Sequence, residues 1–264
     1  MKKYLVIGNP INHSLSPKLH NYWLKKNDIE ANYDKQLIEK KNVKEIIEDL
    51  RGGKIEGLNV TVPLKSEVIR FLDVLSDEAQ ITNSVNTIYK EKDKLIGHNT
   101  DIAGFELAIR YTKYNIEKKK VLILGAGGVA PSIVYALKKL NASEIFISNR
   151  TLEKAEEIKN KFRYLKVLNW GDNYSFDMII NATSVGLNET DNINLNYENK
   201  GENQFFYDVI YNPSETNFLK EAKKKFHRTE NGKMMFIYQA HQAFTIWHKI
   251  MPKIDQKVIN LIND

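Results

Sequence analysis

The sequence contains no cysteine, which excludes folds held by disulfides and metal sites built on thiolates. It also lacks any run close to the roughly 18 apolar residues that a membrane-spanning helix needs. The apolar run near the N-terminus, residues 4–7, stops at Gly8 and is shorter than the ~7–15 apolar residues of a secretory signal. These absences predict a soluble, cytoplasmic protein.

The chain has 264 residues, of which 42% are hydrophobic and 27% charged, a composition typical of a globular protein with one or two domains. Its net charge is +6, from 39 Lys and Arg against 33 Asp and Glu. The basic clusters at residues 118–120 and 223–225 lack the interleaved aromatic residues of a nucleic-acid surface. We therefore expect no nucleic-acid or membrane partner. A mild positive charge suits small anionic ligands.

Short apolar runs alternate with amphipathic stretches along the whole chain. This alternation is typical of an α/β fold whose parallel sheets are covered by helices on both faces. The predicted strands are residues 4–8, 33–38, 57–62, 86–89, 95–97, 121–124, 144–148, 164–168, 178–181 and 206–210. The predicted helices are residues 17–28, 43–51, 67–72, 77–82, 102–114, 130–140, 152–162, 234–250 and 253–262. We expect two α/β domains: residues 1–101, completed by the C-terminal helices 234–264, and residues 102–233.

A glycine-rich loop follows the strand at residues 121–124 and opens a helix. It matches the G-x-G-x-x-G/A pattern of a dinucleotide site and consists of Gly125, Ala126, Gly127, Gly128, Val129 and Ala130. The glycines permit a tight turn and a close approach to a pyrophosphate, which the helix N-terminus attracts. The alternative is an ordinary glycine-rich connection. The pattern predicts that residues 102–233 form a Rossmann domain.

The second strand of this domain ends without the Asp or Glu that would bind a free ribose 2′-hydroxyl. In that place the chain has Arg150, Thr151 and Lys154. Two cations and a hydroxyl at one turn can grip a phosphate. If they were only solvated charges near a helix start, the cations would oppose the helix dipole. The segment therefore predicts NADP and not NAD.

Four polar segments lie at predicted strand ends of the first domain: residues 8–17, 57–65, 84–87 and 97–101. Ser14 and Ser16, at a helix N-terminus, could hold a carboxylate. The simpler alternative is that Ser16 is the N-cap before Pro17. Strand alternation places Asn59 and Thr61 on one face. Lys65 then emerges at the carboxyl edge, where open α/β sheets bind ligands.

The motifs in these segments resemble those of the shikimate dehydrogenase family. Residues 8–21 read G-x-P-x-x-H-S-x-S-P-x-x-H-N, residues 57–65 read G-x-N-V-T-x-P-x-K, residues 85–87 read V-N-T and residues 97–101 read G-x-N-T-D. The resemblance continues through residues 125–130, 149–151, 181–186, 207–213 and 239–240. It spans nearly the whole chain, with the motifs in the same order.

The resemblance implies NADP-dependent, reversible reduction of 3-dehydroshikimate to shikimate in aromatic amino-acid biosynthesis, by a monomer or homodimer. It implies that Lys65 and Asp101 act at the reacting C3 oxygen. The implied substrate contacts are Ser14, Ser16, Asn59, Thr61, Asn86, Tyr211 and Gln239, the last chosen by register over Gln242. Beyond the loop and the cations named above, the implied cofactor contacts are Asn149, Thr183, Ser184 and Gly232.

The chemistry of alcohol oxidation agrees with these residues. Hydride transfer needs a proton acceptor and stabilisation of a developing alkoxide, and a Lys–Asp pair supplies both without a metal. We therefore expect no metal site. Two alternatives remain: a quinate/shikimate dehydrogenase of broader substrate range, and a non-catalytic NADP sensor. The presence of both Lys65 and Asp101 argues against the sensor.

Overall fold

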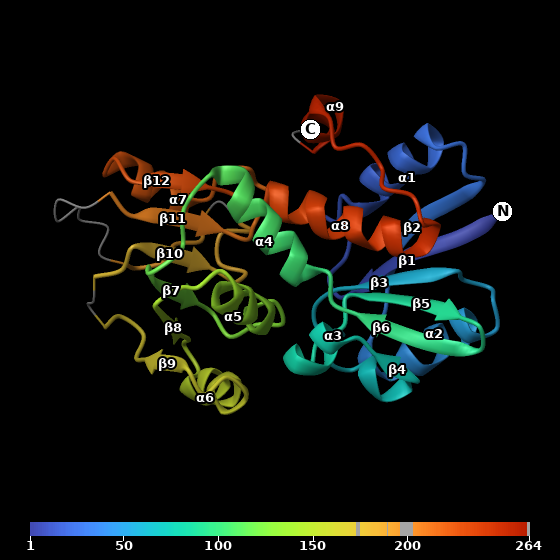
Figure 1. Ribbon diagram of the computed structural model, residues 1–264, viewed down its shortest axis with the longest axis horizontal. Helices are drawn as coiled ribbons and strands as arrows, with labels where there is room; N and C mark the ends of the chain where they lie inside the picture. Colours follow the sequence, from blue (N-terminus) through green and yellow to red (C-terminus); the bar gives the residue numbers. More distant parts are fainter. Residues whose placement is uncertain (173–174, 189, 196–202, 263–264) are drawn as a thin grey trace. The chain divides into compact units, whose positions relative to one another are not determined.

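The computed structural model describes residues 1–172, 175–188, 190–195 and 203–262, and the chain divides into two compact units (Figure 1). Unit 1 comprises Met1–Gly104 and Ile237–Asp264, and unit 2 comprises Phe105–Phe236. The divisions fall inside helices α4 (Asp101–Thr112) and α8 (Lys233–His248). Each unit has its own six-stranded sheet. Within the described ranges, no helix has both the length and the apolar character needed to cross a membrane.

The sheet of unit 1 has the strand order β2-β1-β3-β5-β6-β4. Its strands are β1 (Lys2–Gly8), β2 (Ala31–Leu37), β3 (Gly57–Val60), β4 (Val74–Leu75), β5 (Thr87–Glu91) and β6 (Lys94–His98). β1 runs parallel to β2 and β3, and β4 runs parallel to β6. β5 is antiparallel to β3 and to β6, and β5 and β6 form a hairpin around Lys92 and Asp93. The sheet is therefore mixed: the expected parallel pairing holds for β1, β2 and β3, and the hairpin adds an antiparallel strand.

Helices cover both faces of this sheet, because successive buried side chains of β1 point to opposite faces. Leu5 and Ile7 pack into a core with α2 (Val43–Arg51), which supplies Ile46, Ile47 and Leu50. Tyr4 points to the opposite face, where its ring lies 5.1 Å from that of Trp247 of α8. Helix α1 (Ser16–Lys26) lies on the same side of the sheet as α8 (Figure 1). Its Trp23 packs against Phe244 of α8. The smaller elements of the unit are α3 (Asp77–Thr82), α9 (Gln256–Leu261) and two 3-10 turns, η1 (Lys40–Asn42) and η2 (Ile69–Phe71).

The strand register brings four polar segments to one edge of the sheet. Val60 of β3 pairs with Ile7 of β1, so both strands end together. Thr87, the first residue of β5, pairs with Asn59 of β3 and with His98, the last residue of β6. The segments after β1, after β3, before β5 and after β6 therefore meet at this edge. It is the carboxyl edge of β1 and β3, where α/β sheets bind ligands.

The sheet of unit 2 has the order β12-β11-β10-β7-β8-β9 and is parallel throughout. Its strands are β7 (Lys120–Leu124), β8 (Glu144–Ser148), β9 (Leu165–Leu168), β10 (Met178–Asn181), β11 (Phe205–Asp208) and β12 (Arg228–Glu230). Read from β7, this is the 3-2-1-4-5-6 order of a Rossmann domain, whose switch point lies between β7 and β10. The prediction of two α/β domains, one of them Rossmann-like, is confirmed.

Alternating residues of β11 show how the helices of unit 2 bury its sheet. Phe206 packs in a core with Phe218 and Leu219 of α7 (Asn217–Lys224). On the opposite face, the ring of Tyr207 lies 5.4 Å from Phe105 of α4. The other helices are α5 (Ala130–Lys139), which begins at the glycine-rich loop after β7, and α6 (Leu152–Lys161), which follows β8 (Figure 1).

Several sequence predictions were wrong in detail. Ser16 is not an N-cap: Leu15 holds that position, and the Ser16 hydroxyl accepts from Ser14 instead. Residues 67–72 form only the turn η2. β3 ends at Val60, two residues before the predicted end, so Thr61 lies just past the strand. The prediction missed β4, α7 and β12, although Thr216, the N-cap of α7, precedes an amphipathic run and was a usable signal.

Candidate active site and cofactor loop

A buried ion pair joins Lys65 and Asp101 at the polar edge of the unit 1 sheet. Lys65 follows β3, and Asp101 is the first residue of α4 after β6. The distance from Lys65 Nζ to Asp101 Oδ2 is 2.5 Å, and the two side chains are only 11% and 8% exposed. A lysine and a carboxylate in hydrogen-bond contact can hold or pass a proton. The structure therefore brings together the two residues expected to act at the reacting oxygen.

Asn86 fixes the second oxygen of the Asp101 carboxylate. Its Nδ2 donates to Asp101 Oδ1 at 2.9 Å, while its Oδ1 accepts from the backbone N–H of Thr100 at 2.8 Å. The backbone N–H of Asp101 donates to Asn99 Oδ1 at 3.0 Å. With Lys65 on one carboxylate oxygen and Asn86 on the other, the orientation of Asp101 is set from both sides.

Helix α8 brings Gln239 to this cluster. Asn86 Nδ2 lies 3.5 Å from Gln239 Oε1, a distance at the limit of a hydrogen bond. Gln239 is the glutamine chosen by register in the sequence, and α8 belongs to unit 1 from Ile237 onward. The tail of the chain thus supplies a polar side chain to the site formed by the N-terminal residues.

Asn59 and Thr61 come from the end of β3. Asn59 Oδ1 accepts from the hydroxyl of Tyr33 at 2.7 Å, and Asn59 Nδ2 donates to Asn86 O at 3.0 Å and to Thr87 Oγ1 at 3.1 Å. Thr61 lies against Gly8, where an added Cβ would collide with Thr61 Cγ2. The end of β1 and the segment after β3 can therefore approach each other closely only because residue 8 has no side chain.

Ser14 and Ser16 form a pair before α1. Ser14 Oγ lies 3.2 Å from Ser16 Oγ, to which it donates, and it accepts from the backbone N–H of Ser16 at 3.3 Å. Two adjacent hydroxyls at a helix N-terminus can offer donors to an anion. Because Ser16 is not the N-cap, its Oγ makes no capping hydrogen bond with the first turn of α1.

The glycine-rich loop of unit 2 forms a tight turn at the switch point. Gly125 has a φ of +102°, and a Cβ there would lie 2.7 Å from Thr183 Cγ2 and 3.0 Å from the carbonyl of Ala182. Only glycine fits this position. Asn149 Oδ1 accepts from the backbone N–H of Ala126 at 3.0 Å, which links the loop to the end of β8. The loop then passes through Gly127, Gly128 and Val129 into α5, which begins at Ala130.

Thr183 and Ser184 lie in the loop after β10, on the other side of the switch point. Thr183 donates to Asn181 Oδ1 through its N–H at 3.0 Å and its hydroxyl at 2.7 Å. Ser184 is exposed next to it. Residues from the β7 and β10 loops thus flank the crevice in which a Rossmann domain binds a dinucleotide.

Arg150 and Lys154 are exposed at the start of α6. Within the part of the chain that the structure describes, neither pairs with a carboxylate. Between them, Thr151 is the N-cap of α6, although its side chain accepts no capping hydrogen bond. The carbonyl of Thr151 accepts from Asn149 Nδ2 at 2.7 Å. The two cations are therefore available to an anion at the end of β8.

Tyr211 and Gly232, the remaining predicted site residues, belong to unit 2. The Tyr211 ring stacks on that of Phe236, with centroids 4.3 Å apart. Gly232 N–H donates to Ile210 O at 3.0 Å, and a Cβ on Gly232 would collide with the carbonyl of Val209. Tyr211 is thus the single predicted substrate contact outside unit 1.

Three histidines of unit 1, His20, His241 and His248, lie among aromatic side chains. His20 is fully buried, and burial lowers its pKa to about 3, with His248 adding to the shift. Burial likewise lowers the pKa of His248 to about 4 and lowers that of His241. The His20 ring stacks on Tyr33 at 4.2 Å. These histidines stay neutral near pH 7, so none of the three is a cation in the site.

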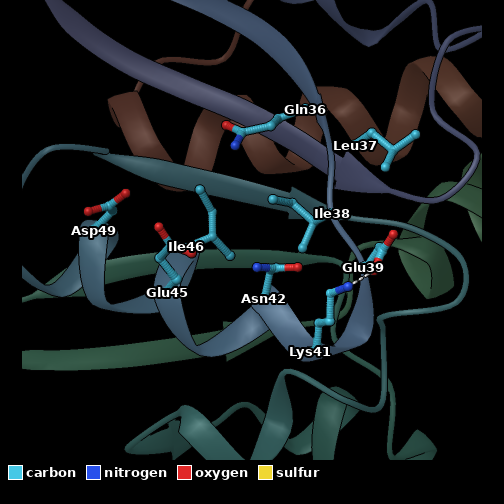
Figure 2. Close-up of a pocket in the computed structure, with 9 residues that line it drawn as sticks. All are labelled: Gln36, Leu37, Ile38, Glu39, Lys41, Asn42, Glu45, Ile46 and Asp49. Carbon is cyan, nitrogen blue, oxygen red and sulfur yellow. Dashed lines mark ion pairs between the residues drawn. The ribbon is translucent and has the colours of Figure 1, made fainter.

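A pocket of about 360 Å³ lies between the end of β2 and α2 (Figure 2). Its lining contains none of the predicted site residues and consists of Gln36, Leu37, Ile38, Glu39, Lys41, Asn42, Glu45, Ile46 and Asp49. Two of its carboxylates already have lysine partners at 2.8 Å, Glu39 with Lys41 and Asp49 with Lys54. Among the described residues, no three His, Cys, Asp or Glu side chains gather as a metal site.

Two residues with polar roles near the site were missed in the sequence. Tyr33 lies in β2 and was counted only as part of a strand, but its hydroxyl reaches Asn59. Asp208 ends β11 and accepts from Asn181 Nδ2 at 3.0 Å. A carboxylate at the end of an apolar strand was the available signal for Asp208, whereas no local pattern marks the Tyr33 contact.

Comparison with known proteins gives a consistent result. A family model described as the shikimate dehydrogenase substrate binding domain matches residues 6–88, and one described as shikimate / quinate 5-dehydrogenase matches residues 106–214. The NADP(+) shikimate dehydrogenase of Pelagibacter ubique is 58% identical over 99% of both chains. A solved shikimate dehydrogenase from Aquifex aeolicus has a TM-score of 0.90 at 34% identity, covering 100% of this chain and 98% of that one.

A second solved structure contains ligands. The shikimate 5-dehydrogenase of Thermus thermophilus, in complex with NADP(H) and shikimate, has a TM-score of 0.89 at 30% identity. The alignment covers 100% of this chain and 98% of that one. These matches agree with the sequence motifs and with the folds of the two units. The chain belongs to the shikimate dehydrogenase family.

Proposed function

We propose that this protein catalyses the NADP-dependent, reversible reduction of 3-dehydroshikimate to shikimate. The observation that carries the proposal is the Lys65–Asp101 pair, which is buried, 2.5 Å long and located at the carboxyl edge of the unit 1 sheet. The family membership of the chain and its full-length match to an NADP(+) shikimate dehydrogenase support the same reaction. We also assign the substrate to unit 1 and the cofactor to unit 2.

The side chains around the pair match the groups of this substrate. Shikimate has a carboxylate at one end and hydroxyls around its ring. Ser14 and Ser16 offer donors for the carboxylate. Donors and acceptors for the hydroxyls come from Asn59, Thr61, Asn86, Gln239 and Tyr211. We expect the contacts from unit 1 to present the C3 oxygen to Lys65 and Asp101.

In the oxidation direction, the C3 hydroxyl must lose a proton as the carbon loses a hydride. The Lys65–Asp101 pair accepts that proton, and the lysine cation stabilises the negative charge that develops on the oxygen. In the reduction direction the pair returns the proton. Asn86 keeps the Asp101 carboxylate in place throughout, because it binds the oxygen that Lys65 does not.

The residues of unit 2 fit NADP. The Gly125 turn has no room for a side chain against Thr183 and Ala182, and the N-terminus of α5 that follows the loop can bind a pyrophosphate. Arg150, Thr151 and Lys154 would hold the 2′-phosphate, and Asn149, Ser184 and Gly232 would line the remainder of the site. When bound, NADP supplies the hydride acceptor in the oxidation direction.

The direct test measures NADPH formation by the purified protein with shikimate and with quinate. We expect NADPH formation with shikimate and much less with quinate. Equal rates would instead support the quinate/shikimate enzyme of broader range. If NADPH binds but neither substrate reacts, the protein is a sensor and the proposed function is wrong. A cytoplasmic monomer or homodimer remains a prediction, to be tested by cell fractionation and by size-exclusion chromatography with light scattering.

A further inference from the structure

A row of three residues, two of them polar, lies at neighbouring strand ends of unit 2 beneath the cofactor loops. Asp208, the last residue of β11, pairs with Asn181, the last residue of β10, and Asn181 pairs with Leu124 at the end of β7. Gly125 follows Leu124 directly. Asp208 and Asn181 are both fully buried. The row therefore connects the interior of the sheet to the crevice at the switch point.

The Asp208 carboxylate has three hydrogen-bond donors. Its Oδ1 accepts from Asn181 Nδ2 and from the backbone N–H of Ile210, each at 3.0 Å, and its Oδ2 accepts from Thr216 Oγ1 at 2.6 Å. No lysine or arginine in the described ranges forms an ion pair with it. Burial raises the pKa of Asp208 to about 6, and the three hydrogen bonds oppose the shift. A buried carboxylate without a paired cation lowers the stability of the folded protein. This cost points to a functional role for Asp208.

Asp208 sets which way the Asn181 amide points, together with the backbone N–H of Thr183 and the carbonyl of Val185. An ionised carboxylate can only accept, so the NH₂ group of Asn181 must face Asp208. The amide oxygen then faces the next loop, where Asn181 Oδ1 accepts from both the N–H and the hydroxyl of Thr183. Asn181 Nδ2 also donates to Val185 O at 3.0 Å. One amide, oriented by Asp208, thus holds both ends of the segment from Thr183 to Val185.

This segment forms the wall against which the glycine turn packs. An added Cβ at Gly125 would meet Thr183 Cγ2 at 2.7 Å. At the far end of the loop, an added Cβ at Gly186 would lie 3.0 Å from Thr216 Cγ2. Thr216 therefore contacts Asp208 through its hydroxyl and lies beside Gly186 through its methyl group. A shift of Asp208 or Thr216 would move the wall of the crevice.

We propose that Asp208 is a positioning residue for the cofactor: through Asn181 it holds the loop of residues 182–186 in the conformation that receives NADP opposite the Gly125 turn. The inference rests on the proposed function. Asp208 itself does not touch the cofactor. It removes the entropic cost of ordering the loop when NADP binds, and such preorganisation increases affinity.

The test compares Asp208→Ala with Asp208→Asn in the full-length protein, with Kd for NADPH measured by fluorescence titration. The alanine variant removes the carboxylate acceptor of Asn181 and leaves only Val185 O. We expect Kd to rise about tenfold or more, the effect of one lost hydrogen bond to a charged group. The asparagine variant keeps an oxygen opposite Asn181 and Ile210, and we expect its Kd to stay within about threefold of wild type. KM for shikimate at saturating NADP should change in neither variant.

Thr112→Val provides the matched control. Like Asp208, Thr112 is a buried polar residue of unit 2, and its hydroxyl donates to Ile109 O at 2.7 Å. It should lower Tm and leave Kd unchanged. If Asp208→Ala does not fold, Thr216→Val replaces it: it keeps the methyl group near Gly186 and removes the donor to Asp208. Kd should rise in this variant and recover in Thr216→Ser.

Two results would overturn the inference. In one, Asp208→Ala, or Thr216→Val in its place, binds NADPH as tightly as Thr112→Val does. In the other, the variant raises KM for shikimate as much as Kd for NADPH, which would indicate general loosening of the fold. Failure of the proposed function is a separate result, because it concerns the wild-type protein, which would then form no NADPH from shikimate whether or not its Kd for NADPH depends on Asp208.

Discussion

The hydroxyl of Tyr33 donates to Asn59 Oδ1 at 2.7 Å, and this bond links β2 to the polar edge of the unit 1 sheet. Asn21 of α1 holds the backbone of Tyr33 from both sides: its Nδ2 donates to Tyr33 O at 2.7 Å, and its Oδ1 accepts from Tyr33 N–H at 2.9 Å. The adjacent His20 stacks on the Tyr33 ring. The His-Asn pair that closes the first sequence motif therefore acts on Asn59 through Tyr33.

Tyr33→Phe should weaken substrate binding because it removes a single oxygen and leaves the ring stacked on His20. Asn59 would lose the donor that sets its amide orientation, and the two bonds from Asn59 Nδ2 to Asn86 O and Thr87 Oγ1 would be less fixed. We expect KM for shikimate to rise about three- to tenfold, and the free energy of unfolding to fall by about 1 kcal/mol, as for a typical lost hydrogen bond. Steady-state kinetics and urea unfolding measure the two effects.

Tyr111→Phe is the control for this change, because the Tyr111 side chain is 50% exposed in unit 2. It should alter neither quantity. If Tyr33→Phe kept a wild-type KM, Asn59 would not depend on Tyr33 for its position.

The sequence predicted the elements with strong local signals. The helix at residues 43–51 has buried side chains on one face at helical spacing and matches α2 residue for residue. The glycine loop, with a strand before it and a helix after it, was also located correctly. Both predictions depend on patterns within about a dozen residues. Local backbone geometry links such patterns directly to secondary structure.

Long-range packing decided the features that were missed. β4 has only two residues, Val74 and Leu75, which is too short for any alternation to show. β5 runs antiparallel to β3, and local hydrophobicity carries no strand direction. The Asp208–Asn181 contact joins residues 27 apart in the chain, so only the register of neighbouring strands reveals it.

Lys65→Ala should reduce catalysis far more than substrate binding. A positioned proton-transfer group contributes about 10²- to 10⁴-fold, so we expect kcat to fall by that factor while KM for shikimate changes much less. Removing the lysine also leaves the Asp101 carboxylate buried without its cation, and Tm should decrease. Steady-state kinetics and a thermal melt separate the two effects.

Lys54→Ala is a suitable control, because Lys54 pairs with Asp49 at the same unit's surface, with the lysine side chain 78% exposed. This variant should keep its kcat. A near-normal kcat in Lys65→Ala would remove Lys65 from the mechanism.

His20 should make the protein less stable as the pH falls below neutral. Its pKa is about 3 in the folded state against an ordinary value of 6.5, so between these values the unfolded chain binds a proton that the folded chain does not. The contribution of neutral His20 to stability is therefore complete above about pH 6.5 and is lost as the pH falls toward 3. The free energy of unfolding should be lower at about pH 5 than at about pH 7.

His20→Phe should flatten this pH dependence, since phenylalanine can stack on Tyr33 and does not titrate. His241 and His248, whose pKa values are also lowered, should keep part of it. Asp208 acts in the opposite direction, because its raised pKa of about 6 makes its contribution decrease as the pH rises through that value. Urea unfolding of both proteins at several pH values tests the prediction, and an unchanged slope in His20→Phe would contradict it.

Arg150→Ala should weaken NADP binding and leave NAD binding nearly unchanged. The argument begins with an absence, because β8 ends in Ser148 with no Asp or Glu directly after it to hold a free 2′-hydroxyl. Arg150 and Lys154 stand there instead, exposed and unpaired with any carboxylate of the described chain. A guanidinium can bind a phosphate through two hydrogen bonds. Losing bonds of this kind should raise KM for NADP about 10- to 150-fold.

The measurement compares KM for NADP and for NAD in the wild type, in Arg150→Ala and in Arg163→Ala. Arg163 is also exposed in unit 2 but follows α6 rather than preceding it, so its loss removes the same charge from another place. Only Arg150→Ala should change the ratio of the two KM values. If the wild type uses NAD as well as NADP, or if Arg150→Ala raises both KM values equally, then Arg150 does not read the 2′-phosphate. Because NAD lacks only that phosphate, the ratio isolates the contact from any general effect on the dinucleotide site.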